Sequence, residues 1–211
     1  MDGLTGSSLF CFIILRQNVI FSFWYFFCKD ISVNKLEKNI RKELKYMNLN
    51  NFTIKAQEAV QQAVQLVTKN NQQVIEPVHL LKAVIMTGES VTNFIFQKLG
   101  VNAQNLNMVL DRQIESYPKV SGGEPYLSSE SNAVLQKAID YSSKMGDQYV
   151  SLEPIILALF TEKSTASQIL KDAGVTEKEL RQAIEELRKG NKVTSQSAEE
   201  TYDALGKYAS I

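Results

Sequence analysis

Cysteine and histidine are almost absent from this chain of 211 residues, which contains only Cys11, Cys28 and His79. A zinc site needs several nitrogen or sulfur ligands close together, and a cysteine nucleophile needs a histidine base and an orienting group. No cysteine lies beyond residue 28, and no serine lies in a G-x-S-x-G turn. We therefore expect no metal site and no hydrolytic centre, and we expect that this chain is not an enzyme.

An excess of charge is also absent, since 23 basic residues balance 23 acidic ones. Sequence-independent binding to nucleic acid depends on lysine and arginine side chains that neutralise phosphates, and no basic stripe is present, so we expect no nucleic-acid partner. The phosphate-binding pattern G-x-x-x-x-G-K-[ST] is missing, because Gly206-Lys207 is followed by Tyr208 and has no glycine five positions earlier. We expect no cofactor, including ATP and magnesium, to bind this chain.

The first 46 residues differ in character from the rest. Residues 9–28 are apolar and aromatic-rich and have about the length of a membrane span, but Arg16 lies at their middle, where a charge is costly. The basic residues follow this stretch, which is the reverse of a signal peptide. The interpretation we favour is that translation starts at Met47 and that residues 1–46 are upstream sequence read in frame. A signal anchor and an unusual cytosolic arm are the alternatives.

The middle of the chain is a duplication in which residues 52–114 recur as residues 127–188. The offset is 75 positions at first, pairing Thr53 with Ser128 and Ile75 with Val150, and it becomes 74 after one residue is lost. Each half must bury its apolar stripes against its own helices or against its twin. A groove between the related halves is a natural binding site.

Each half has the pattern of four helices. In the first half, alanine and valine residues from Ala56 to Val67 form one helical stripe behind the cap Thr53. Pro77 suits the first turn of a second helix, Gly100 the end of a third, and Asn102 the cap of a fourth. The second half repeats these signals, and they are Ser128, Ser151, Gly174 and a capping box at residues 176–179.

These signals predict an all-α fold of two tandem pseudo-repeats with about eight helices, joined by the Gly- and Pro-rich loop 118–125. We find no pair of strand signals. We expect three segments: an extension at residues 1–46, the duplicated domain at residues 47–190, and a polar linker at residues 191–211.

Several runs carry a resemblance to a known family. They are Phe52-Thr53, Ile75-Glu76-Pro77-Val78-His79-Leu80-Leu81 and Leu99-Gly100-Val101, each repeated about 75 residues later, and the tail from Ala198 to Tyr208. Together they resemble the double Clp repeat, the N-terminal domain of Clp-family AAA+ unfoldases. The Glu-Pro-x-His-Leu-Leu form is most similar to the ClpB-type disaggregases, and the tail resembles the stretch that leads these proteins into their first ATPase module.

The resemblance implies a cytoplasmic, all-helical domain that binds unfolded or aggregated polypeptide and passes it to a hexameric AAA+ motor, which works with the DnaK chaperone system. The motor, with its ATP and magnesium, would belong to a longer parent protein. The positions that the family links to substrate contact match here at Thr53, Ser128, Asp147 and Glu153. Two groove positions differ, because Lys137 and Pro154 stand where better-known relatives carry leucine.

Each of these residues also has a plain structural interpretation. Thr53 and Ser128 are helix caps, and His79 is a packing residue near a helix start. Asp147 and Glu153 bracket a helix start, where they interact with the helix dipole or form a polar rim for a bound peptide. An adaptor-binding regulatory domain of a Clp protease unfoldase is the alternative function. A membrane-tethered chaperone fragment, with residues 9–28 as anchor, is a third.

Overall fold

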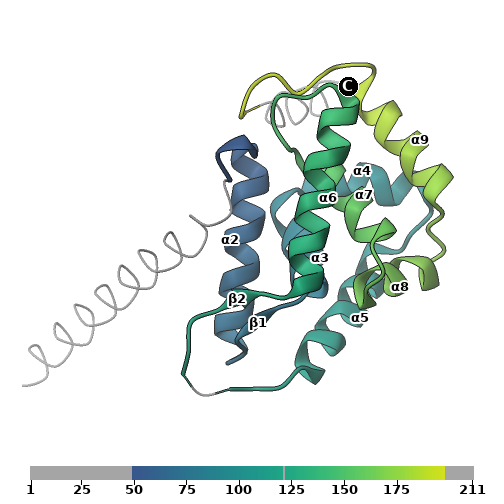
Figure 1. The fold of residues 1–211 in the computed structure, drawn as a ribbon. Helices are drawn as coiled ribbons and strands as arrows, with labels where there is room; N and C mark the ends of the chain where they lie inside the picture. The colour runs from purple at the N-terminus through teal and green to yellow at the C-terminus, as the bar shows by residue number, and fades with distance from the viewer. Residues whose placement is uncertain (1–48, 121, 198–211) are drawn as a thin grey trace, which may run out of the picture. The chain divides into compact units, whose positions relative to one another are not determined.

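The computed structural model describes residues 49–120 and 122–197, which lie within one of two units of the chain, residues 47–211. The expectations about residues 1–46, the start at Met47 and the tail 198–208 fall outside the described residues. Eight α-helices occupy the described part, so the all-α prediction is confirmed (Figure 1).

The first repeat contains the 3-10 turn η1 and four helices, and the second repeat contains four more. In chain order they are η1 (Leu49–Asn51), α2 (Ile54–Lys69), α3 (Pro77–Thr87), α4 (Glu89–Lys98), α5 (Ala103–Ser116), α6 (Ser129–Met145), α7 (Leu152–Thr161), α8 (Thr165–Asp172) and α9 (Glu177–Arg188). Two short strands, β1 (Val74–Ile75) and β2 (Tyr126–Leu127), complete the described elements.

The predicted helix ends are confirmed at most positions. The Thr53 hydroxyl accepts a hydrogen bond from the Ala56 amide at 3.2 Å, and the Ser128 hydroxyl accepts one from the Ser131 amide at 3.1 Å. Each cap satisfies one of the amides that a first helical turn leaves without a partner. Gly174 ends α8 with a φ of 89°, a left-handed conformation that favours glycine.

Only one of the two hydrogen bonds that define the capping box predicted at residues 176–179 is made. Thr176 caps α9, but the Glu179 carboxylate accepts the Thr176 hydroxyl at 2.6 Å, and no bond to the Thr176 amide is made. The complete box lies at α3, where the Glu76 amide donates to Nδ1 of His79 at 3.0 Å. Sequence reasoning missed it because histidine, not glutamate or glutamine, stands three residues after the cap.

The two repeats interlock through their strands. Ile75 of β1 pairs in parallel with Leu127 of β2, and Phe52 forms a parallel bridge with Val150. The offset of 75 converts one pairing into the other, so the two contacts are pseudo-symmetric copies. These strands escaped prediction because two residues are too short to show alternation.

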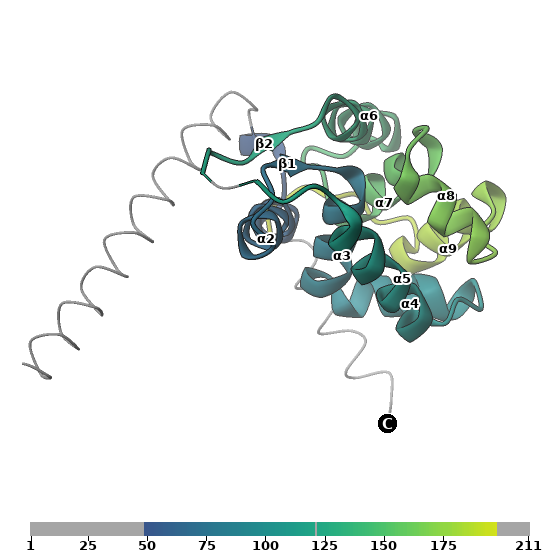
Figure 2. The ribbon, with the colours of Figure 1, turned by 90° about the horizontal axis from the view of Figure 1, so that it is seen from below.

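The core lies around α3 and α7, the two most apolar helices. α2 packs on α3, and α7 lies among α3, α6, α8 and α9 (Figure 2). Leu81 of α3 and Leu157 of α7 are fully buried. Burial of such a side chain contributes about 1.5–3 kcal/mol, so this centre holds the two repeats together as one domain.

Residues 191–196, which fall within the predicted polar linker, pack back against the domain, and we name them the strap. The chain reverses after α9 through Lys189 and Gly190, which both have a positive φ. The Gln148 amide donates to the Val193 carbonyl at 2.9 Å, and the Ile54 amide donates to the Gln196 carbonyl at 2.9 Å. The strap therefore runs from the end of α9 to the start of α2.

Candidate functional site

The caps Thr53 and Ser128 lie at opposite ends of the domain. The Thr53 amide bonds to the Val150 carbonyl, beyond the C-terminal end of α6, and the Ser128 amide bonds to the Ile75 carbonyl, beyond the C-terminal end of α2. The helices that they cap, α2 and α6, run in opposite directions (Figure 1). α2 has 16 residues, which corresponds to a length of roughly 24 Å. Thr53 is fully buried and Ser128 is half-buried, so the two caps do not share one groove.

Asp147 and Glu153 meet at a single buried cation, Arg188, the last residue of α9. Nη2 of Arg188 lies 2.8 Å from Oδ2 of Asp147, and its Nε lies 3.2 Å from Oε1 of Glu153. Nη2 also donates to Oγ of Ser151 at 3.0 Å. Both carboxylate side chains are completely covered, so the expectation that they form a polar rim at the surface is wrong.

Arg188, Asp147 and Glu153, which we name the Arg188 cluster, are three charged groups in a buried site. Burial alone would lower the pKa of the guanidinium, but attraction to Glu153 and Asp147 outweighs it, and the pKa of Arg188 is raised. Asp147 Oδ2 and Glu153 Oε2 have no hydrogen-bond partner among the described residues, although Oδ2 is within ion-pair distance of Arg188. Removing the cation would leave two buried carboxylates uncompensated, which typically costs about 3–5 kcal/mol.

Thr53, Asp147 and Glu153 thus fall in one neighbourhood, joined through the segment Val150-Ser151. Val150 accepts the Thr53 amide, and Ser151 accepts from Arg188, which holds the two carboxylates. Sequence reasoning did not include Arg188. The duplication did indicate that this arginine is buried, because the offset of 74 aligns it with the buried Ile114.

The first repeat holds a neutral counterpart of this cluster. Gln72, which the offset of 75 aligns with Asp147, donates its amide to the Ile114 carbonyl at the end of α5. Its Oε1 lies 2.9 Å from Nε2 of the fully buried His79. Burial lowers the pKa of His79 to about 4, so the ring is neutral near pH 7.

The described residues contain no group of three or more His, Cys, Asp or Glu side chains that could hold a metal.

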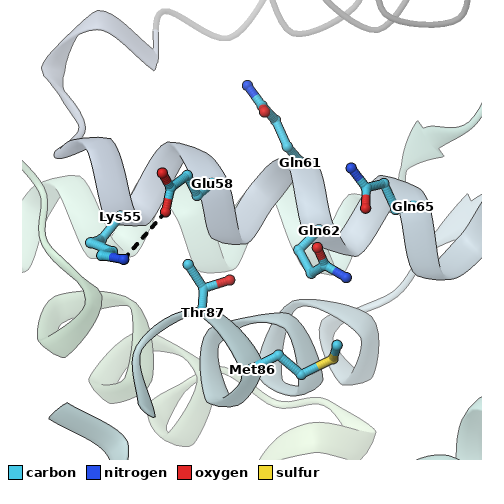
Figure 3. A pocket seen from close by; sticks show the side chains of 7 residues that line it. All are labelled: Lys55, Glu58, Gln61, Gln62, Gln65, Met86 and Thr87. Atoms are coloured by element: carbon cyan, nitrogen blue, oxygen red, sulfur yellow. Dashed lines mark ion pairs between the residues drawn. The ribbon is translucent and has the colours of Figure 1, made fainter. Parts of the chain in front are cut away.

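A groove between α2 and the end of α3 forms a surface cavity in the first repeat, with a volume of about 390 Å³ (Figure 3). Lys55 and Glu58 form an ion pair at 3.6 Å along it, and Gln62 points toward α3 (Figure 3). Met86 is 49% exposed. The lining residues are Lys55, Glu58, Gln61, Gln62, Gln65, Met86 and Thr87. Sequence reasoning did not find this groove, because most of its lining is typical of a solvated helix face.

The equivalent crossing of α6 and α7 in the second repeat is bridged by an ion pair. The offset of 75 aligns Gln62 with Lys137 and Thr87 with Glu162, and these two charged side chains contact one another. The hydrogen bond to Glu162 raises the pKa of Lys137. Pro154, the other position that departs from the family pattern, is buried in the first turn of α7. The two crossings therefore differ, since among the described residues an ion pair joins α6 to the end of α7 and none joins α2 to α3.

In the part of the chain that the structure describes, none of the helices combines the length and apolar character that crossing a membrane requires.

The sequence matches the Clp repeat (R) N-terminal domain over residues 51–173. It is 69% identical over 163 residues to the chaperone protein ClpB of Bacteroides thetaiotaomicron and 60% identical over 163 residues to that of Porphyromonas gingivalis. Each match covers 77% of this chain and 19% of the relative, so the chain spans about a fifth of their length.

Solved structures support the same fold. The Hsp104 N-terminal domain from Candida albicans matches with a TM-score of 0.64 at 24% identity, over 71% of this chain and 99% of that one. The N-terminal domain of the chaperone ClpD from Arabidopsis thaliana matches with a TM-score of 0.52 at 22% identity, over 64% and 95%. The high-identity relatives are ClpB chaperones, so the adaptor-binding alternative is not favoured. This chain belongs to the Clp repeat N-terminal domain family and is of the ClpB type.

Proposed function

We propose that this domain engages unfolded or aggregated polypeptide on behalf of a ClpB-type disaggregase and passes it to a hexameric AAA+ motor in the longer protein. The observation that carries the proposal is the open groove between α2 and α3. The motor, its ATP and magnesium, a DnaK chaperone system as partner and a cytoplasmic location belong to the same proposal. The domain itself would catalyse no reaction.

The lining of the groove suits a ligand that has no fixed sequence. Three glutamine side chains line it, and each carboxamide offers one acceptor and two donor hydrogens. None of them hydrogen-bonds to another described residue, so they can pair with the peptide groups that an unfolded chain displays. Met86 adds a flexible apolar side chain that adapts to different partners.

In this proposal, Thr53, Ser128, Asp147 and Glu153 support substrate binding from within the fold. Thr53 fixes the start of α2, only two residues before Lys55 of the groove. Asp147 and Glu153 hold Arg188, and Asp147 also holds the strap that reaches the start of α2. Ser128 fixes α6 in the second repeat.

The test is a fluorescence titration of a labelled, permanently unfolded protein with the 211-residue chain. A single domain that binds a flexible ligand should reach only tens of micromolar, or about −6 kcal/mol. The variant Gln62→Ala/Gln65→Ala removes two hydrogen-bonding side chains, worth about 0.5–1.5 kcal/mol each, and should weaken binding by about tenfold.

The matched control is Gln136→Ala/Asp140→Ala, at the twin positions of Gln61 and Gln65 on the exposed face of α6. It should bind as the unmodified chain does. Absence of binding at about 1 mM, or equal weakening by both double variants, would remove the groove from the proposal.

A further inference from the structure

The strap is fastened at two points, and both use its backbone. At the first point, the Val193 amide donates to Oδ1 of Asp147 at 2.9 Å while its carbonyl accepts from Gln148 at 2.9 Å. At the second, the Gln196 carbonyl accepts from the Ile54 amide, and its side-chain amide donates to the Asn50 carbonyl at 3.1 Å. The Val193 side chain is fully buried, so the strap contributes to the core.

The two carboxylate oxygens of Asp147 have different partners. Oδ2 lies against the Arg188 guanidinium, and Oδ1 accepts the strap amide. Glu153 binds the same guanidinium but makes no bond to the strap. The cluster thus contains one carboxylate that bonds to the strap and one that does not. Changing each in turn distinguishes an effect on the strap from a general effect on the stability of the domain.

The strap also completes the start of α2. The Ile54 amide is one of the first-turn donors that a helix cannot satisfy internally, and the Gln196 carbonyl satisfies it. The same helix lines the groove described above. A displacement of the strap would therefore act both on residues 191–197 and on the first turn of α2.

We infer that Asp147, oriented by Arg188, is a positioning residue that clamps the strap to the second repeat and thereby fixes the point from which the chain continues beyond residue 197. The clamp makes the position of residues 191–197 a property of the folded domain. Release of the clamp frees the strap while the eight helices stay folded.

The experiment compares Asp147→Ala with Glu153→Ala in the 211-residue chain by amide hydrogen exchange and limited trypsin digestion. Both variants remove one carboxylate from Arg188, but only Asp147→Ala removes the acceptor of the Val193 amide. We expect at least tenfold faster exchange at Val193 and faster cleavage after Lys192 in Asp147→Ala. Glu153→Ala should change either rate by less than threefold, with the helices of both variants still protected.

The variant Val193→Ser tests the attachment of the strap without changing any residue of the ion cluster. It weakens the buried anchor of the strap and should also speed cleavage after Lys192, even if Asp147→Ala proves unable to fold. The inference fails if Glu153→Ala frees the strap as much as Asp147→Ala does. It also fails if cleavage after Lys192 is as fast in the unmodified chain as in Val193→Ser.

Discussion

Acidification should destabilise the domain through its single histidine. Nδ1 of His79 accepts the Glu76 amide, so Nε2 carries the proton and donates to Gln72. A second proton on Nδ1 would face a donor within a buried site. Burial accordingly lowers the pKa of His79 from 6.5 to about 4.

The sign follows from proton linkage. Between pH 6.5 and about 4 the unfolded chain binds a proton at His79 that the folded chain does not, so stability falls as the pH falls. A difference of about 2.5 in pKa corresponds to a total of about 3 kcal/mol, of which about 2 kcal/mol is lost between pH 7 and pH 5. Above pH 6.5 the contribution is fully present.

Urea unfolding followed by circular dichroism at pH 7 and pH 5 measures this loss. His79→Gln cannot take up the proton, so its stability should fall by about 2 kcal/mol less over the same interval. Because the chain has one histidine, its imidazole NMR signal also reports the pKa without any assignment. A pKa above 6, or equal pH dependence in both proteins, would refute the reasoning.

Three further predictions test the caps, a helix end and the lack of nucleotide binding. Thr53→Ala and Ser128→Ala should each lower the free energy of unfolding in urea by about 1 kcal/mol, and the losses should add in the double variant because the caps lie at opposite ends of the domain. Strong non-additivity would contradict that separation. Gly174→Ala should cost about 1 kcal/mol in thermal melting, because the φ of 89° is unfavourable for alanine although no neighbour lies within 4 Å of the added carbon. An unchanged melting temperature would count against it. Calorimetric titration with ATP and magnesium should show no saturable binding below about 1 mM, because no phosphate-binding glycine loop is present in the sequence.

Local order was predictable from the sequence because its causes are local. The duplication, the apolar stripes and the cap residues act within a few positions, and the structure places helices where they indicated. The Thr53 cap of α2 and the left-handed conformation of Gly174 could be predicted from the neighbouring residues alone. The family followed from the same repeated runs.

The parts that sequence reasoning missed depend on residues far apart in the chain. Arg188 meets Glu153 across 35 positions, and Val193 meets Asp147 across 46. No periodic pattern encodes such pairings, and a polar residue such as Asp147 looks the same whether it faces water or a buried cation. The polar rim was expected for this reason, and the complete burial of both carboxylates contradicts it.

The difference between the α2–α3 and α6–α7 crossings offers the most direct test of the proposed function. The variant Gln62→Lys/Thr87→Glu copies the ion pair of Lys137 and Glu162 into the first repeat and should close the α2–α3 groove. Titration of the labelled unfolded protein should then show at least tenfold weaker binding, with the melting temperature and helical signal preserved. Unchanged affinity in this folded variant would contradict the claim that the first-repeat groove engages polypeptide.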